Sequence, residues 1–359
     1  FGTSLYADDI QPVWIKVENR SEEHYILMKT GVDPDGFSPL EAAYQRHSGS
    51  KETKKEMNLF FHSKGFHNPI KAGQTTSGFI FTNRDEGHKA VNIDLLSDND
   101  LKTFSFVVRV EGLFTDYSQV DFDSVYEEWI EIDSESELRA VLASFPCCTA
   151  NKKGDKWGDP LNIVMIGRKA DIFSALIRSG WHETEVTYGA SAWKTVKSFA
   201  FGTSYRYSPI SPLYVFDRQQ DIGLQRARNT IHLRNHMRLW RTQYNYQGYE
   251  VYLGQISRDV GVKFNKRTIT THAIDPDVDD TRNNLIADLA YSQAMSKFAF
   301  VKGSQVSTLQ DPHYNLTPDP YYSDGLRAVM FFESRPTTLD KIDVLEWEQT
   351  RVQKELNEN

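Results

Sequence analysis

Residues 231–240 read Ile231-His-Leu-Arg-Asn-His-Met-Arg-Leu-Trp240, and this stretch decides how the second half of the chain can fold. Polar and apolar side chains alternate along it, which predicts a β-strand with two different faces. The apolar face is expected to carry Ile231, Leu233, Met237 and Leu239. The polar face is expected to carry His232, Arg234, His236, Arg238 and Trp240. At the mouth of a groove, its guanidinium and imidazole groups would form an anion site; the alternative is a sheet face in contact with water.

A second chemistry-rich stretch follows, Thr271-His-Ala-Ile-Asp-Pro-Asp-Val-Asp-Asp-Thr-Arg282, ahead of an expected helix. Its alternate aspartates have the spacing of a calcium loop, but the glycine and glutamate that an EF-hand needs at its sixth and twelfth positions are absent. The simpler interpretation is that Asp279 or Asp280 caps the helix and that Arg282 pairs with these acids across one turn. A catalytic acid or base is another alternative. Metal ligation is a weak alternative for Asp275, Asp277 and Asp279.

The composition limits the classes of function. The chain of 359 residues is 39% hydrophobic and 25% charged, with a net charge of −8, which is typical of a globular protein long enough for two domains. The acidic balance argues against a general nucleic-acid binder, and no apolar run approaches the roughly 18 residues of a membrane-spanning helix. No phosphate-loop, serine-elbow or zinc-helix motif is present, so we predict no cofactor.

The N-terminal part, residues 1–124, is predicted to be an antiparallel β-sandwich of immunoglobulin-like type. Runs at 13–17, 75–83, 89–96 and 102–110 are rich in β-branched and aromatic residues and are separated by Gly, Asp and Asn. A helical insertion is expected near 38–64. There, Ser38-Pro-Leu-Glu41 is a capping box that begins a short helix, and one or two further turns are expected over Met57–Ser63 after a polar loop.

Residues 125–338 change to alternating strands and helices, which predicts a mixed α/β domain and an α+β chain overall. Ser134-Glu-Ser-Glu137 is expected to begin a helix that ends before Pro146, and Asp171 to cap another. Helices are also expected at 193–200, 221–228 and 280–296. Strands are expected at 161–166, 213–216, 248–258 and 326–333. Residues 339–359 form a charged tail that we expect to be helical.

Several segments together resemble a known family. They are Phe145-Pro-Cys-Cys-Thr149, Gly158-Asp-Pro-Leu-Asn162, Gly180-Trp181, Gln220-Asp-Ile-Gly-Leu-Gln225, Arg234-Asn-His-Met-Arg-Leu-Trp240 and His272-Ala-Ile-Asp-Pro-Asp-Val-Asp-Asp-Thr-Arg282. In this order, from about residue 137 to 335, they resemble the LssY C-terminal domain family. The N-terminal sandwich resembles the module that precedes this domain in standalone members.

The resemblance implies a context more than an activity. The family is named for a component ascribed to type I secretion, and in larger relatives the domain is joined to DedA-like membrane segments and a type-2 phosphatidic-acid phosphatase domain. The catalytic residues of that phosphatase lie outside this domain, so none is assigned here. The implied context is bacterial and envelope-associated, on the periplasmic side. Because the chain starts at Phe1 rather than at methionine, a removed signal, a lipoprotein anchor or a trimmed chain is expected.

Three functions stay open from the sequence. The first, which we favour, is binding of a protein partner or of a membrane-associated, phosphate-containing anion in a groove, without turnover. The candidate ligand-binding residues are His232, Arg234, His236, Arg238, His272, Asp275 and Arg282. The second is a hydrolase, metal-independent or metal-assisted, acting on a phosphate-containing envelope molecule, with His272 or Asp275 as general acid or base and Arg238 stabilising negative charge. The third is a structural or assembly module.

Overall fold

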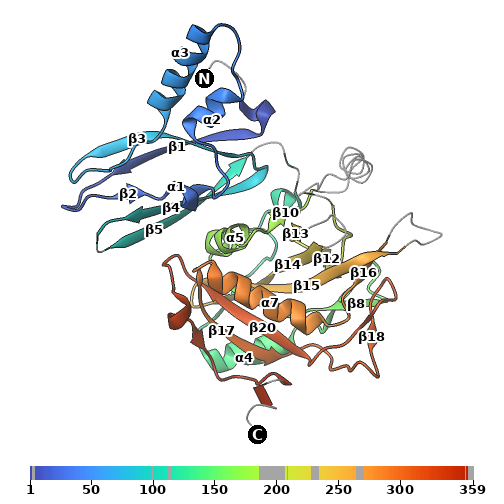
Figure 1. Ribbon diagram of the computed structural model, residues 1–359. Helices are drawn as coiled ribbons and strands as arrows, with labels where there is room; N and C mark the ends of the chain where they lie inside the picture. Colours follow the sequence, from blue (N-terminus) through green and yellow to red (C-terminus); the bar gives the residue numbers. More distant parts are fainter. Residues whose placement is uncertain are drawn as a thin grey trace. The chain divides into compact units, whose positions relative to one another are not determined.

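The structure is a computed structural model that describes residues 1, 5–98, 100–110, 113, 115–185, 207, 209–227, 234–263, 271–351 and 353–354. The chain divides into two compact units, Phe1–Gly112 and Leu113–Asn359 (Figure 1). The boundary that the sequence suggested, at 124/125, therefore lies inside the second unit.

The first unit consists of two thin β-layers, with two helices on the outer face of one layer and Val32 of another helix in the core between the layers. Its elements are η1 (Leu5–Asp8), β1 (Ile10–Glu18), β2 (Ile26–Leu27), α1 (Lys29–Val32), α2 (Pro39–Tyr44), α3 (Lys51–Lys64), β3 (Thr75–Asn83), β4 (Gly87–Leu96) and β5 (Leu101–Val110). β1 pairs with β3 in one sheet, and β2, β4 and β5 form the other (Figure 1). Alternate apolar side chains such as Ile15 and Ile80 meet Val91 and Ile93 between the sheets. The other face of β1 and β3 packs on α2 and α3 through Ile10, Phe61 and Phe81.

The predicted helical insertion is present, but its second helix is longer than expected. Ser38 accepts a hydrogen bond from the Glu41 backbone and forms the capping box that was predicted at the start of α2. The polar stretch expected to be a loop is instead the first half of α3, because Ser50 caps that helix through the Thr53 backbone. The prediction of a helix limited to Met57–Ser63 is therefore wrong.

The sandwich in the first unit has few strands in the part that the structure describes. Its described strands form one two-stranded and one three-stranded antiparallel sheet, so an immunoglobulin-like topology is not confirmed. What is confirmed is the mixed, mainly antiparallel character of the chain.

The second unit is built around one large sheet. Its described strands run in the order β10-β13-β14-β15-β9-β20-β17-β21, with β16 paired to β15 and β6 to β14. Neighbours are mostly antiparallel; β9–β20, β17–β21 and β6–β14 are parallel. The strands of this sheet are β6 (Ile130–Ile132), β9 (Ile163–Gly167), β10 (His182–Glu183), β13 (Ile222–Ala227), β14 (Arg234–Tyr246), β15 (Tyr249–Lys263), β16 (Thr271–Ile274), β17 (Met295–Lys302), β20 (Leu326–Phe332) and β21 (Asp343–Val344).

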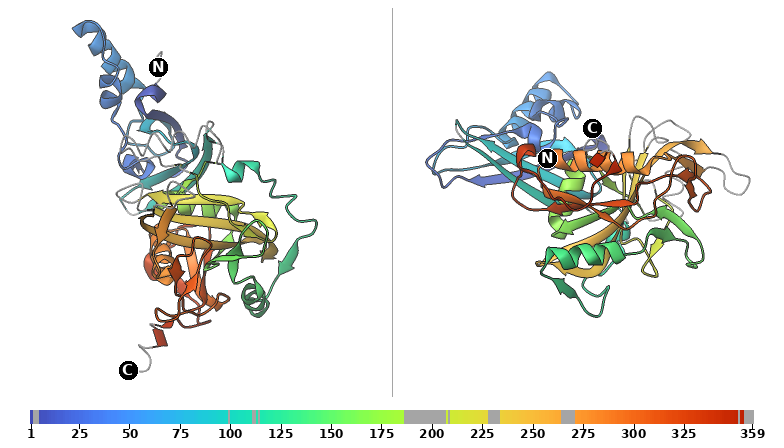
Figure 2. Two further views of the ribbon diagram at one scale, coloured as in Figure 1. Left: turned by 90° about the vertical axis from the view of Figure 1, so that its right-hand side faces the viewer. Right: turned by 90° about the horizontal axis from the view of Figure 1, so that it is seen from below.

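Helices cover both faces of this sheet. α4 (Glu135–Ser144) lies on one face and α7 (Val278–Tyr291) on the other (Figure 2). α5 (Lys169–Arg178) packs on β9 and β20. A four-stranded sheet adds β7 (Cys148–Ala150), β8 (Trp157–Pro160), β11 (Tyr214–Val215) and β12 (Arg218–Gln219). The remaining elements are η2 (Asp116–Gln119), the pair β18 (His313–Tyr314) and β19 (Pro320–Tyr321), and η3 (Leu339–Lys341). Leu142 of α4 packs with Trp240, Leu253 and Val329 in the main apolar core.

Several local predictions for this unit need correction. The helix expected at 221–228 is strand β13, paired on both sides with β10 and β14. Arg168, not Asp171, is the N-cap of α5, and Asp171 binds Arg168 from the first turn. The tail forms η3 and β21 before the helical residues 351 and 353–354. The helix expected at 193–200 lies outside the described residues. In the described chain no helix has the length and apolarity to cross a bilayer.

Candidate functional site

One face of the hairpin β14–β15 changes from apolar to polar along its length. Trp240 and Leu253 are paired and lie in the core beneath α4. The same face then carries Arg238 opposite Gln255, and next His236 opposite Ser257, because every second side chain of a strand points the same way. Arg234 and Arg238 are only 4% and 6% exposed. The alternative of a solvated sheet face is therefore wrong for both arginines.

Arg238 is held tightly by the protein itself. Its Nε and Nη2 donate to the Ser211 carbonyl at 3.1 and 2.9 Å, and its Nη1 donates to Gln255 Oε1 at 3.0 Å. Burial lowers the pKa of the guanidinium, and the nearby carboxylates of Asp159 and Asp259 oppose that shift. Arg238 thus organises the polar face, with its donors turned toward neighbouring protein groups.

Arg234 lies beside a pair formed by the partly buried His236 and the buried Asp259. Its Nη1 donates to Gln225 Oε1 at 2.8 Å. Nearby, His236 Nε2 lies 3.6 Å from Asp259 Oδ2. Burial raises the pKa of Asp259 to about 7, although the charges of Arg234 and Arg238 act to lower it. A buried carboxyl group that titrates near neutrality beside an imidazole can take up or release a proton at physiological pH.

Asp159, which comes from another sheet, lies close to the polar face of the hairpin. Asp159 of β8 accepts a hydrogen bond from Asn315 Nδ2 at 2.9 Å. Burial raises the pKa of Asp159, and its charge acts on both Arg238 and Asp259. We call the set that these contacts and electrostatic interactions connect the polar cluster: Asp159, Arg234, His236, Arg238, Gln255 and Asp259.

Two buried donors of the polar cluster have no hydrogen-bond partner in the part of the chain that the structure describes. They are Arg234 Nε and Gln255 Nε2, and Gln255 is fully buried. Leaving a buried donor unsatisfied costs about 1–3 kcal/mol. The cluster can therefore offer hydrogen bonds to acceptor oxygens of a ligand.

Sequence reasoning missed Asp159, Gln255 and Asp259. A tight turn at Gln247 and Gly248, both with positive φ, places β15 directly against β14, but the turn alone does not identify Gln255. The pairing register shifts between Arg241 and Asn245, and only beyond that shift does Gln255, rather than Ser257, fall opposite Arg238. Asp159 reaches the cluster from another sheet, and no local pattern predicts that contact.

The acidic stretch before α7 performs a different task. The N-cap is Asp277, which accepts from the Asp280 backbone at 3.0 Å; the prediction of Asp279 or Asp280 as the cap is wrong. Asp279 instead accepts from Ser323 Oγ at 2.9 Å and from the Asp324 backbone at 2.6 Å. Asp275 lies 3.6 Å from Arg258.

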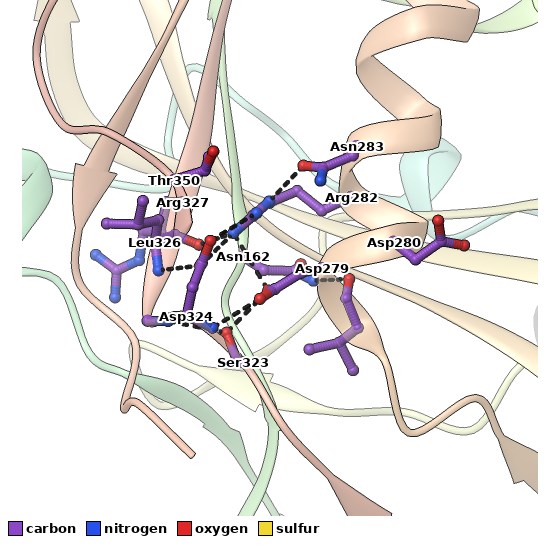
Figure 3. A network of polar contacts seen from close by, with 12 residues as sticks. Asn162, Asp279, Asp280, Arg282, Asn283, Ser323, Asp324, Leu326, Arg327 and Thr350 are labelled. Carbon is purple, nitrogen blue, oxygen red and sulfur yellow. Dashed lines mark hydrogen bonds and ion pairs between the residues drawn. The ribbon is translucent and has the colours of Figure 1, made fainter. Parts of the chain in front are cut away.

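Arg282 is fully buried at the centre of this second network, between Asp279 and Asp324 (Figure 3). Its Nη1 and Nη2 donate to the Asp324 carboxylate at 2.8 and 3.1 Å, and Nη1 also donates to the Leu326 carbonyl at 2.8 Å. Asp279 Oδ1 lies 3.2 Å from Nη1, which confirms the predicted pairing across one turn, and Nε donates to Asn283. We call this set, Asp279, Arg282, Ser323 and Asp324, the Arg282 network.

The candidate residues therefore do not line one common groove. Ser257 and Asp259 of β15 share the face of His236, whereas Arg258 between them points to the opposite face and binds Asp280 at 2.8 Å. Arg234, His236 and Arg238 are together on the first face; Asp275 and Arg282 belong to the α7 face. His232 lies outside the described residues, and of His272 only the backbone, in β16, is described.

The weak metal candidates are engaged in other contacts. Asp277 caps α7 and accepts from Tyr322, while Asp279 is held by Ser323 and Arg282. Across the described ranges, no three His, Cys, Asp or Glu side chains come together as a set that could hold a metal ion.

Comparison with known proteins gives one match. The family model for the LssY C-terminus matches residues 140–326, more than half of the 359-residue chain, and confirms the resemblance expected from the sequence. The polar cluster and the Arg282 network both fall within the matched range, and the first unit lies outside it. Neither a curated protein nor a solved structure matches the chain.

Proposed function

The chain belongs to the LssY C-terminal family, and we propose that its second unit binds an anionic, phosphate-containing ligand at the polar cluster. The observation that carries the proposal is the pair of buried donors without partners among the described residues, Arg234 Nε and Gln255 Nε2. Phosphate oxygens accept several hydrogen bonds at once, and guanidinium groups match their geometry. Such a ligand would supply acceptor oxygens for donors of this kind.

The carboxyl groups of the cluster make this binding dependent on pH. An ionised Asp259 would repel an anion, whereas a protonated Asp259 donates a hydrogen bond to it. Because burial raises the pKa of Asp259 to about 7, its proton is available near neutrality. Ligand binding should therefore take up a proton and strengthen as the pH falls from 8 to 6.

The context implied by the family resemblance bears on the source of the ligand. A membrane lipid with a phosphate headgroup fits a protein of the bacterial envelope, and we include that location in the proposal. A free phosphate monoester offers the same acceptor oxygens, so an experiment has to separate the two sources.

The test is thermal unfolding at pH 6 and pH 8 with inorganic phosphate, glycerol 3-phosphate, short-chain phosphatidic acid and, as a control, short-chain phosphatidylcholine. A ligand at one hundred times its dissociation constant adds about 2.7 kcal/mol to the free energy of unfolding. We expect Arg234→Gln to abolish this shift, because it removes a donor that points into the cluster. Arg258→Gln is the matched control: it removes an arginine from the other face of the neighbouring strand and should keep the shift.

Two results would contradict the proposal. One is an equal shift in the wild type and in Arg234→Gln. The other is a pH dependence of the shift that is the same in the wild type and in Asp259→Asn, because the phosphate ligands titrate in this range themselves and only the difference between the two proteins reports on Asp259.

A hydrolase is the second candidate, and one observation favours it. The Asp259 carboxyl group, with a pKa of about 7, lies 3.6 Å from His236 Nε2, and groups that titrate near the working pH are efficient general acids and bases. Release of inorganic phosphate from glycerol 3-phosphate or phosphatidic acid would be measured. Turnover that Asp259→Asn abolishes while ligand binding persists would favour this candidate; binding without turnover in the wild type would exclude it for these substrates.

A further inference from the structure

The first unit contains an apolar groove along the edge of its smaller sheet. The groove has a volume of about 410 Å³ and lies between β1, from Val13 to Glu18, and the β4–β5 hairpin. Phe104, Phe106 and Val108 of β5 line it and are 46%, 53% and 50% exposed. Three large apolar side chains in a row, half exposed in one groove, are unusual on a surface that only contacts water.

The exposed side chains of Phe104 and Phe106 lie where an additional strand beside β1 would cover them. Phe104 pairs with Ile93 and Phe106 with Val91 in the β4–β5 hairpin, so all four side chains point toward the other sheet. That sheet contains only β1 and β3 among the described residues. Val91 and Ile93 are covered by it and buried, whereas Phe104 and Phe106 lie beyond β1 and stay exposed. A third strand beside β1 would cover them.

The free edge of β1 offers the backbone groups that such a strand needs. The carbonyl of Phe79, the partner of Trp14, accepts from Phe66 on the far side of β3, and the carbonyl of Phe81, the partner of Pro12, accepts from Phe37. Trp14 and Pro12 are therefore in non-hydrogen-bonded pairs, and their backbone groups point to the free edge, as do those of Lys16 and Glu18 by alternation. Pro12 has no N–H, so pairing is restricted to the part of β1 that lines the groove, roughly 17 Å long at about 3.4 Å per residue.

The charges along this edge restrict the chemistry of the occupant. Lys16 and Glu18 are the charged residues that line the groove. Glu18 is already bound by Arg20 at 3.0 Å, whereas no described carboxylate forms an ion pair with Lys16. A strand with a carboxylate beside Lys16 would form a cross-strand pair of opposite charge.

We propose that this groove binds an extended segment of a partner protein by strand addition to β1. The segment is apolar at every second residue, so that these side chains cover Phe104, Phe106 and Val108, and it carries a carboxylate next to Lys16. In this mode main-chain hydrogen bonds supply affinity and the alternate side chains supply specificity. The proposal concerns the first unit and does not depend on the anion site.

The test uses the full chain and a fluorescein-labelled peptide of nine residues in which valine alternates with threonine and glutamate. A second peptide has the same composition with its valines in one block, and a third has N-methyl groups on the residues that would bond to β1. Fluorescence polarisation should show binding of the alternating peptide and at least tenfold weaker binding of the other two. Equal binding of the block peptide or of the N-methylated peptide would overturn strand addition.

Variants of the protein locate the site. Phe106→Glu should weaken binding of the alternating peptide at least tenfold. Leu101→Glu, at an equally exposed position of the same strand (58%) that does not line the groove, should change it less than twofold. Lys16→Glu should weaken it two- to fivefold. Sedimentation of the unliganded protein tests the other occupant: a dimer that Phe106→Glu dissociates would show that a second copy fills the groove, and would overturn the proposal.

Discussion

Two buried arginines of the second unit, Arg282 and Arg234, differ in how many of their N–H donors have hydrogen-bond partners within the protein. Arg282 is fully buried, and its Nε, Nη1 and Nη2 all donate to described protein groups, two aspartates among its partners. Arg234 is almost as buried, but its Nε has no hydrogen-bond partner in the described part of the chain. A closed network fixes structure, whereas an open one is able to bind something else. Burial of an arginine alone thus does not identify a binding site.

The largest effect is expected where the network is closed. Arg282→Met leaves the Asp279 and Asp324 carboxylates, which are 18% and 13% exposed, without their fully buried cation, and breaking a buried pair in this way costs about 3–5 kcal/mol. Urea unfolding at pH 7 measures the loss. Arg168→Met is the matched control, because Arg168 and Asp171 also form an i,i+3 pair, but the Arg168 side chain is 60% exposed. Exposed pairs contribute about 0.2–1 kcal/mol, so similar losses in both variants would remove the distinction.

The second-largest effect distinguishes the polar cluster from the Arg282 network by the pH dependence of the free energy of unfolding. The Asp259 pKa is raised from 3.8 to about 7 by burial, so the folded protein holds this proton more tightly than the unfolded chain. Its contribution to stability is complete below about pH 4 and is lost as the pH rises through about 7. At about 1.4 kcal/mol per pKa unit, the loss is on the order of 4 kcal/mol for a shift of this size.

Asp259→Asn should remove that loss, because an amide stays neutral at every pH. We expect the variant to be more stable than the wild type at pH 8 and equal to it near pH 4, as measured by urea unfolding across this range. The variant should still lose some stability as the pH rises, because burial also raises the pKa of Asp279 in the Arg282 network, to about 6. If the free energy of unfolding changed between pH 4 and pH 8 by the same amount in Asp259→Asn and in the wild type, Asp259 would be ionised over this whole range in the folded protein.

The polar cluster and the Arg282 network also show which contacts can be predicted from the sequence. Contacts between residues close in sequence can be predicted, and pairings between distant strands cannot. The capping box at Ser38 and the pairing of Arg282 with Asp279 are contacts over three residues, and both were predicted correctly. The region 221–228 was predicted to be helical and is a strand, because β10 and β14 pair with it on both sides. Tertiary pairing of this kind overrides local preference.

The candidate site shows the same limit. Alternation along β14 correctly placed Arg234, His236 and Arg238 on one face. Their acidic partners, Asp159 and Asp259, come from two other strands, and no spacing within one segment reveals them. The sequence prediction grouped Arg282 with the three β14 residues as ligand-binding residues of one groove, although Arg282 lies on the α7 side of the sheet. Only the register of β14 against β15 separates the two faces.

The smallest effect tests whether the acidic stretch is a cap or part of a ligand site. Asp277→Ala removes the side chain that accepts from the Asp280 backbone at the start of α7, and loss of such a cap costs typically about 1 kcal/mol. Asp277→Asn should restore most of this stability, because an amide oxygen caps a helix nearly as well. Both variants should keep the wild-type thermal shift with phosphate ligands, since Asp277 lies on the face of the sheet opposite Arg234. Loss of that shift in Asp277→Ala would mean that the acidic stretch before α7 and the polar cluster form one ligand site, and would contradict the distinction between them.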